Sequence, residues 1–222
     1  MGILITIDGL DGSGKQTQSE LLYDRLVKEG IGVRLVSFPD YDSDSSALVK
    51  MYLGGEFSHD PDAVNAYASS SFFAVDRFAS FVKNWKKDYD EGKVIIANRY
   101  TTANAIHQLT KIEGESERKA FLDWLYDFEF KKLAIPSPDL TLFLEVPVEI
   151  SLSLIRKRSD ETGREIDIHE NEGHLKRAYS AALFSAEALG WSTVHCSENG
   201  EMRTREAIAE EIYTLVKKSL EA

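Results

Sequence analysis

A glycine-rich segment near the start of the chain, GLDGSGKQTQ from Gly9 to Gln18, restricts the possible fold more than any other feature of the sequence. It follows ILITIDG, an apolar run rich in β-branched residues that is typical of a buried parallel strand. It precedes TQSELLYDRLVKEG, in which apolar residues recur near helical spacing and Gly30 ends the pattern. A strand, a glycine loop and a helix in this order predict a loop whose backbone N–H groups surround phosphate oxygens.

The segment departs from the usual phosphate-loop pattern at one position. That pattern has Gly, four residues, Gly and Lys, and then a Ser or Thr whose hydroxyl contacts Mg²⁺. Here Lys15 is followed by Gln16, and the first hydroxyl comes one residue later, at Thr17. The departure weakens the prediction of a metal ligand more than the prediction of a phosphate site. An ordinary strand-to-helix turn with a surface lysine is the structural alternative.

Strand and helix patterns alternate along the rest of the chain. The other predicted strands lie at residues 32–40, 93–100, 139–146 and 193–196. Helical patterns lie at residues 17–30, 61–92, 116–135, 148–158 and 178–189 and at the C-terminal end. This alternation predicts one α/β domain over residues 1–222, a three-layer α/β/α fold of the phosphate-loop NTPase type with a five-stranded parallel sheet.

Composition and charge disfavour several classes of protein. The chain has 222 residues, of which 43% are hydrophobic and 28% charged, as expected of a globular protein with a sizeable core. Its apolar runs have the length of strands and are too short to span a membrane. A net charge of −11 disfavours a nucleic-acid-binding surface. The single cysteine, Cys196, lies in an apolar stretch and predicts an inert thiol, for which the cytoplasm is the natural compartment.

Several segments together with the glycine loop resemble the thymidylate kinase family of nucleoside monophosphate kinases. The loop carries an acidic residue, Asp11, as the family's loop does, and SFPDY resembles the family's Phe-Pro motif. FFAVDR resembles its thymine-facing helix, NRYTTANAIHQ its Asp-Arg-Tyr segment, and PDLTLFLEV its fourth strand. The resemblance spans nearly the whole chain in the right order. It implies transfer of a phosphoryl group from ATP to dTMP in dTTP biosynthesis, with Mg²⁺ as cofactor, and we expect a homodimer.

The resemblance also implies roles for individual residues around the acceptor, dTMP. Phe73 would stack on the thymine ring, Arg77 would donate to its carbonyl edge, and Asn104 would form hydrogen bonds with the base. Arg99 would hold the monophosphate. The remaining residues implied at the acceptor are Phe38, Tyr41 and His107.

The glycine loop and a lid would hold ATP and the transferred phosphoryl group. The residues implied at ATP are Gly9, Leu10, Asp11, Gly12, Ser13, Gly14, Lys15, Gln16 and Thr17. Asp11 would lie near the sugar hydroxyl or the metal, and Lys15 would place its charge at the β- and γ-phosphates. The polar stretch over residues 156–171 would be a mobile lid whose arginines, Arg164 first and Arg158 second, stabilise the transferred phosphoryl.

Most of these residues also have a structural interpretation. Phe73 could be plain core, Phe38 could cap the second strand, and Arg77 could form a surface ion pair. Tyr41 and His107 could be ordinary boundary residues. The run Arg156–Arg158 could be a solvated helix end.

Two departures from the family lie near the expected phosphates. Asn98 stands where the family usually has Asp, and Gln16 where it commonly has Ser or Thr. These departures predict a loose Mg²⁺ shell, formed chiefly by nucleotide phosphates, water and Asp11. The functional alternatives are a kinase for another nucleotide or nucleoside, and a nucleotide-binding module with little turnover. A nucleic-acid-binding ATPase is the least supported.

Overall fold

The centre of the molecule is a sheet of five parallel strands in the order β2-β3-β1-β4-β5. The computed structural model describes residues 1–58, 60, 62–162 and 172–221. The strands are β1 (Ile3–Gly9), β2 (Val33–Ser37), β3 (Val94–Asn98), β4 (Leu140–Glu145) and β5 (Ser192–His195). A small antiparallel pair, β6 (Ser197–Glu198) and β7 (Glu201–Met202), follows β5. The predicted five-stranded parallel sheet is confirmed.

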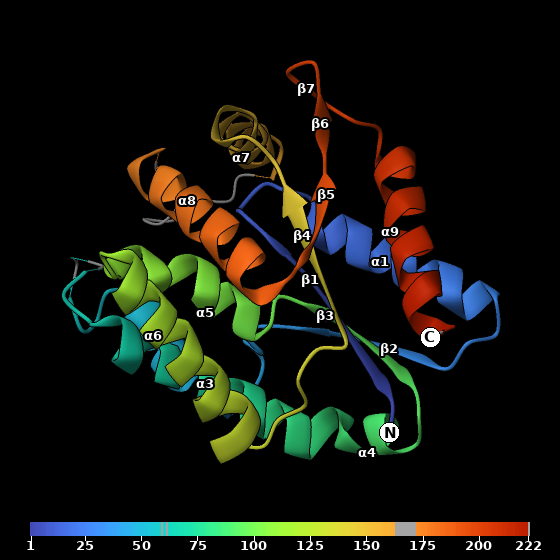
Figure 1. Cartoon of the computed structure of the whole chain (residues 1–222), viewed down its shortest axis with the longest axis horizontal. Helices are drawn as coiled ribbons and strands as arrows, with labels where there is room; N and C mark the ends of the chain where they lie inside the picture. Colours follow the sequence, from blue (N-terminus) through green and yellow to red (C-terminus); the bar gives the residue numbers. More distant parts are fainter. Residues whose placement is uncertain (59, 61, 163–171, 222) are drawn as a thin grey trace.

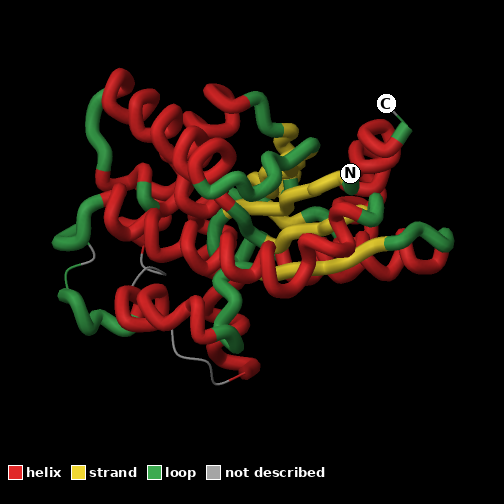
Figure 2. Tube along the Cα trace, turned by 90° about the horizontal axis from the view of Figure 1, so that it is seen from below, coloured by secondary structure: helices red, strands yellow, loops and turns green. Residues whose placement is uncertain are grey.

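Helices cover both faces of the sheet, so the fold has three layers (Figures 1 and 2). One face is covered by α1 (Lys15–Lys28) and α9 (Arg205–Leu220), which lie side by side. The helices over the other face are α3 (Ala66–Ser80), α5 (Thr101–His107), α6 (Glu115–Tyr126) and α8 (Glu172–Leu189). The α7 helix (Val148–Thr162) lies beyond the carboxyl end of β4, and the short helices are α2 (Ala47–Leu53) and α4 (Lys86–Asp90).

The alternation of side chains along β1 explains why apolar residues occupy both faces of this strand. Ile5 and Ile7 pack in the same cluster as Leu22 of α1. Leu4, the residue before Ile5, packs with Trp85 on the opposite face. Successive residues of a strand point to opposite faces, so a strand covered on both sides is apolar at nearly every position.

Several boundaries differ from the sequence predictions. The helical stretch predicted at residues 61–92 begins at Ala66, where the Asn65 side chain accepts a hydrogen bond from the Ala68 N–H at 2.9 Å, and it contains a π-helical turn over Phe81–Trp85. The helix predicted to end at residue 158 continues to Thr162 as α7, and α8 begins at Glu172 instead of Ala178. The short helices α2 and α5 were not predicted.

The predicted lid is only partly described. Residues 156–162 form the end of α7, whereas residues 163–171, including Arg164, lie outside the described residues. The side chain of Arg158 also lies outside the described part. No helix among the described residues is long and apolar enough to cross a membrane.

Candidate active site

The glycine loop connects β1 to α1 at the carboxyl edge of the sheet, where ligands bind in open parallel sheets. Gly14 caps α1 with φ +85°, and Gly12 has φ +79°. A Cβ at Gly12 would lie 2.9 Å from the backbone oxygen of Ser151 in α7. Both the left-handed backbone and this close approach require glycine. The loop therefore takes a conformation that brings its N–H groups and the start of α1 to one place.

Lys15, the first residue of α1, extends back over the glycine loop. Its Nζ donates to the carbonyl oxygens of Gly9 at 3.0 Å and Leu10 at 2.7 Å, and the residue is 8% exposed. Gly9 and Leu10 are buried, and they contribute their carbonyl oxygens to the lysine. The loop thus holds the positive charge of Lys15 close to its own backbone.

One cavity of about 840 Å³ adjoins the loop and contains most of the predicted site. The predicted residues that line it are Asp11, Gly12, Ser13, Gly14, Lys15, Gln16, Thr17, Phe38, Tyr41, Phe73, Arg77, Arg99, Asn104 and His107. These residues come from segments far apart in the sequence. The fold therefore brings the residues predicted to bind ATP and those predicted to bind dTMP into one cavity.

Arg99 lies at the centre of this cavity's polar wall. It has φ +63°, which is uncommon for a residue with a side chain and is found more often at functional sites than elsewhere. Its Nη2 donates to Asp11 Oδ1 at 2.5 Å, and its Nη1 lies 3.8 Å from Asp8 Oδ1. Burial opposes the charged guanidinium, but the carboxylates of Asp11 and Asp8 outweigh it and raise the pKa of Arg99. The site therefore holds a permanent cation.

Arg99 contacts a hydrogen-bonded pair of histidines, His107 and His174. The Nη1 of Arg99 lies 2.9 Å from His107 Nε2, and His107 Nδ1 lies 3.4 Å from His174 Nε2 in α8. Because arginine only donates, His107 Nε2 must accept, and its proton is then on Nδ1, which donates to His174. Burial, followed by the charge of Arg99, holds the pKa of His107 well below its ordinary value. His107 is accordingly neutral.

The two residues that depart from the family pattern contact each other. Asn98 Nδ2 donates to Gln16 Oε1 at 2.6 Å and to Ser37 Oγ at 3.1 Å. Gln16 Nε2 in turn donates to Glu20 at 2.5 Å. The amide oxygen of Gln16 is thus already an acceptor for Asn98, and the two neutral residues form one unit between the end of β3 and the start of α1.

The acceptor end of the cavity is aromatic and strongly hydrogen-bonded. Phe73 lies edge-on to Tyr52, with ring centroids 6.1 Å apart. Arg77 is 1% exposed and pairs with the buried Glu129, so its ion pair is not a surface one. Phe38 is 4% exposed and belongs to the core as well as lining the cavity. Tyr41, in contrast, is 52% exposed at the same cavity.

Comparison with known proteins agrees with this geometry. The thymidylate kinase family model matches residues 7–208, which include the glycine loop, both ends of the cavity and four of the five strands of the central sheet in full. The chain belongs to the thymidylate kinase family.

Individual members of this family match most of the chain. A thymidylate kinase of Mycobacterium tuberculosis (strain H37Rv) is 31% identical over 193 residues, 85% of this chain and 87% of that protein. A thymidylate kinase of Halothermothrix orenii is 30% identical over 219 residues, 97% of each chain. A probable thymidylate kinase of Thermococcus gammatolerans is 33% identical over 164 residues, 73% of this chain and 74% of that protein.

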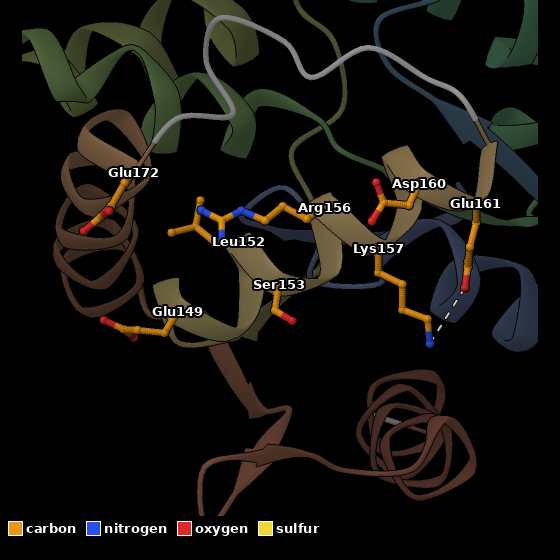
Figure 3. A pocket seen from close by; sticks show the side chains of 8 residues that line it. All are labelled: Glu149, Leu152, Ser153, Arg156, Lys157, Asp160, Glu161 and Glu172. Atoms are coloured by element: carbon orange, nitrogen blue, oxygen red, sulfur yellow. Dashed lines mark ion pairs between the residues drawn. The ribbon is translucent and has the colours of Figure 1, made fainter.

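A second hollow, of about 670 Å³, lies along α7 (Figure 3). Arg156 points from α7 towards α8, which carries Glu172, and Lys157 pairs with Glu161 at 3.9 Å. Lys157 and Glu161 also line the large cavity. The exposed charges in this hollow fit the interpretation of this run as a solvated helix end, and none of the described residues that line it is aromatic.

Three residues of the site were missed from the sequence. Asp8 accepts hydrogen bonds from the Gly9 N–H at 2.8 Å and Thr102 Oγ1 at 2.6 Å, and its position at the end of a buried strand was a usable signal. His174 lies in α8, which was predicted to begin later. Glu129 lies in a charged helical stretch, DFEFKK, where the sequence gives no sign that this glutamate is buried.

Proposed function

We propose that this protein transfers the γ-phosphoryl group of ATP to dTMP and forms ADP and dTDP, in the supply of dTTP. The single cavity that joins the glycine loop to Phe73, Arg77, Arg99 and Asn104 carries this proposal, together with membership of the family. An oxygen of the dTMP phosphate attacks the γ-phosphorus, and the bond to the β–γ bridging oxygen breaks. Two anions must therefore be held together, which requires positive charge and little covalent chemistry.

The side chains of the cavity can supply that charge and orientation. Lys15, fixed over the loop, lies where the β- and γ-phosphates would bind. Arg99 would exchange its contact with Asp11 for the monophosphate of dTMP, for which a guanidinium fork is well suited. Phe73 offers a stacking face, while Arg77 and Asn104 face the edge of the base.

Mg²⁺ is the expected metal, and the oxygen atoms at the loop fit a hard cation. Asn98 Oδ1 is buried and has no hydrogen-bond partner in the described part of the chain. Within the described ranges no group of three or more His, Cys, Asp or Glu side chains is placed to hold a metal ion. Asp11, whose carboxylate lines the cavity at the loop, would be the main protein ligand, and the nucleotide phosphates and water would provide the others. The bound ion would neutralise charge on the phosphates.

A homodimer in the cytoplasm completes the proposal. Three large apolar side chains, Val75, Phe78 and Val82, are 46%, 40% and 51% exposed. Their spacing places them along one side of α3 and the turn that follows it. Exposed apolar surface of this kind is typical of an interface, and a second copy of this chain is the occupant that we propose. The lone buried thiol of Cys196 suits a reducing compartment.

A coupled assay of ADP release tests the function directly. The panel contains dTMP, dUMP, dCMP, dAMP, dGMP and thymidine, each with ATP and Mg²⁺. We expect the highest kcat/KM with dTMP. A higher value with another acceptor would indicate a different nucleotide or nucleoside kinase, and ATP binding without acceptor-dependent ADP release would indicate a binding module.

A further inference from the structure

Glu129 is fully buried, yet no step of the proposed transfer uses its carboxylate. It lies in a π-helical turn, η4 (Asp127–Lys132), that follows α6. A buried carboxylate is costly unless it is paired and hydrogen-bonded. The contacts of Glu129 therefore indicate its role.

The Glu129 carboxylate joins three elements and binds two of the side chains assigned to the base. Arg77 of α3 donates from Nε to Oε2 at 2.7 Å and from Nη2 to Oε1 at 2.5 Å, in a two-pronged contact. Thr101 of α5 donates to Oε2 at 2.7 Å. Asn104, also of α5, donates from Nδ2 to Oε1 at 3.3 Å. Neither Arg77 nor Asn104 can turn without losing a contact to Glu129.

These contacts determine which way the Asn104 amide faces. Its Nδ2 donates to Ser70 O at 3.2 Å and to Glu129, and both of these neighbours can only accept. The NH₂ group must face them, and no described contact uses Oδ1, so an acceptor remains for a ligand in the cavity. Arg77 can only donate, and no described contact uses its Nη1. The wall thus offers one acceptor and one donor.

This arrangement distinguishes two kinds of pyrimidine. Thymine and uracil carry a carbonyl group beside a ring N–H, which matches the donor of Arg77 and the acceptor of Asn104. Cytosine carries an amino group beside a bare ring nitrogen, so donor would face donor and acceptor would face acceptor. Buried polar groups that are mispaired in this way are strongly disfavoured.

We propose that Glu129 is a positioning residue that selects keto pyrimidine monophosphates over aminopyrimidine ones, because it holds Arg77 as donor and turns Asn104 to present its acceptor. The inference rests on the proposed function and adds the residue that sets the selectivity of that site. Arg77 and Asn104 would contact only the edge that thymine and uracil share. We therefore expect Glu129 to have the same effect on the binding of dUMP as on the binding of dTMP.

Glu129→Gln tests the inference, because it keeps the shape and replaces one oxygen by an NH₂ group. Both oxygens accept from Arg77, so either orientation of the new amide sets a donor against Arg77. With the NH₂ group in place of Oε1, the acceptor for Asn104 Nδ2 is lost as well. We expect the ratio of kcat/KM for dTMP over dCMP to fall about tenfold or more, chiefly through KM for dTMP. The KM for ATP should not change. Asp127→Asn, in the same turn but 40% exposed, is the matched control and should leave the ratio unchanged.

Binding measured by calorimetry separates this inference from the proposed function, because it needs no turnover. Affinities of dTMP, dUMP and dCMP are compared for the parent and Glu129→Gln, and circular dichroism checks folding. A parent that prefers dTMP and a variant that keeps the same preference would overturn the role of Glu129 while the function stands. A parent without preference for dTMP would overturn the function itself. If Glu129→Gln does not fold, Glu129→Asp decides. It keeps the charge but shortens the side chain, so the carboxylate is withdrawn from Arg77 and Asn104, and an unchanged ratio would refute the inference.

Discussion

Lys15 is held by two carbonyl oxygens of its own loop, so its charge is in place before ATP binds. We predict that Lys15→Ala lowers the rate of phosphoryl transfer by about three to five powers of ten, by analogy with the loss of other cationic groups at this chemistry. The fold should persist, because the loss of these hydrogen bonds costs only about 1 kcal/mol each. Lys28→Ala, at the exposed end of α1, is the control. Activity within a few-fold of the parent would remove the loop from the mechanism.

His107 gives the stability of the protein a specific pH dependence. Burial and the nearby Arg99 keep its pKa well below 6.5 in the folded chain, whereas the unfolded chain binds a proton as the pH falls through about 6.5. Below that pH the unfolded state holds more protons at this residue, so stability falls as the pH falls. The slope from one such group is at most about 1.4 kcal/mol per pH unit.

His107→Gln should remove that part of the dependence. Urea unfolding at pH 7 and pH 5 should show a smaller loss of stability for the variant than for the parent. His195→Gln replaces a histidine that is 72% exposed and should behave as the parent does. An equal loss in all three proteins would show that His107 titrates normally in the fold.

At the scale of elements, we expect the contact between α1 and β3 to determine how tightly Mg²⁺ binds. Gln16 and Asn98 are neutral where hard-cation ligands are more usual, and they use their amides on each other. We predict a high Mg²⁺ requirement, and Asn98→Asp or Gln16→Thr should lower the Mg²⁺ concentration for half-maximal rate. Because the two side chains touch, the effects of the two substitutions on the Mg²⁺ requirement should not be additive in the double variant. Saturation of the parent at Mg²⁺ barely above ATP, with neither variant shifting the curve, would refute this.

The elements that were predicted well are those with a strong local pattern. β1 and β3 are mainly apolar because both faces of the sheet are covered, and Gly12 and Gly14 are required by the backbone of the loop. The helices α2 and α5 have seven residues each, too few for an apolar period to be recognised.

The parts of the site that could not be predicted depend on tertiary contacts. Glu129 stands among charged residues of a helical pattern, and only packing against α3 and α5 buries its carboxylate. The sequence located Gln16 and Asn98 separately, 82 positions apart, and only the pairing of strands brings them together. The roles of the named site residues stay predictions, and so does the single domain over residues 1–222.

At the scale of the whole molecule, the apolar side of α3 predicts self-association. Phe78→Glu places a charge among Val75 and Val82, and burying that charge in an interface is costly. Light scattering after gel filtration should show a dimer for the parent and a monomer for Phe78→Glu. Val27→Glu, at a site 48% exposed on α1, should remain a dimer. A monomeric parent, or a dimeric Phe78→Glu, would place any interface elsewhere.

We predict that one cavity holds ATP and dTMP and that a phosphoryl group passes between them. The most direct measurement follows a label on the γ-phosphoryl group of ATP in the presence of dTMP and Mg²⁺, with products separated by chromatography. We predict one labelled dTDP for each ADP formed. Label in inorganic phosphate, with unlabelled dTMP recovered, would show a hydrolase, and unchanged ATP with dTMP still bound would show a protein that binds nucleotides without transferring phosphate.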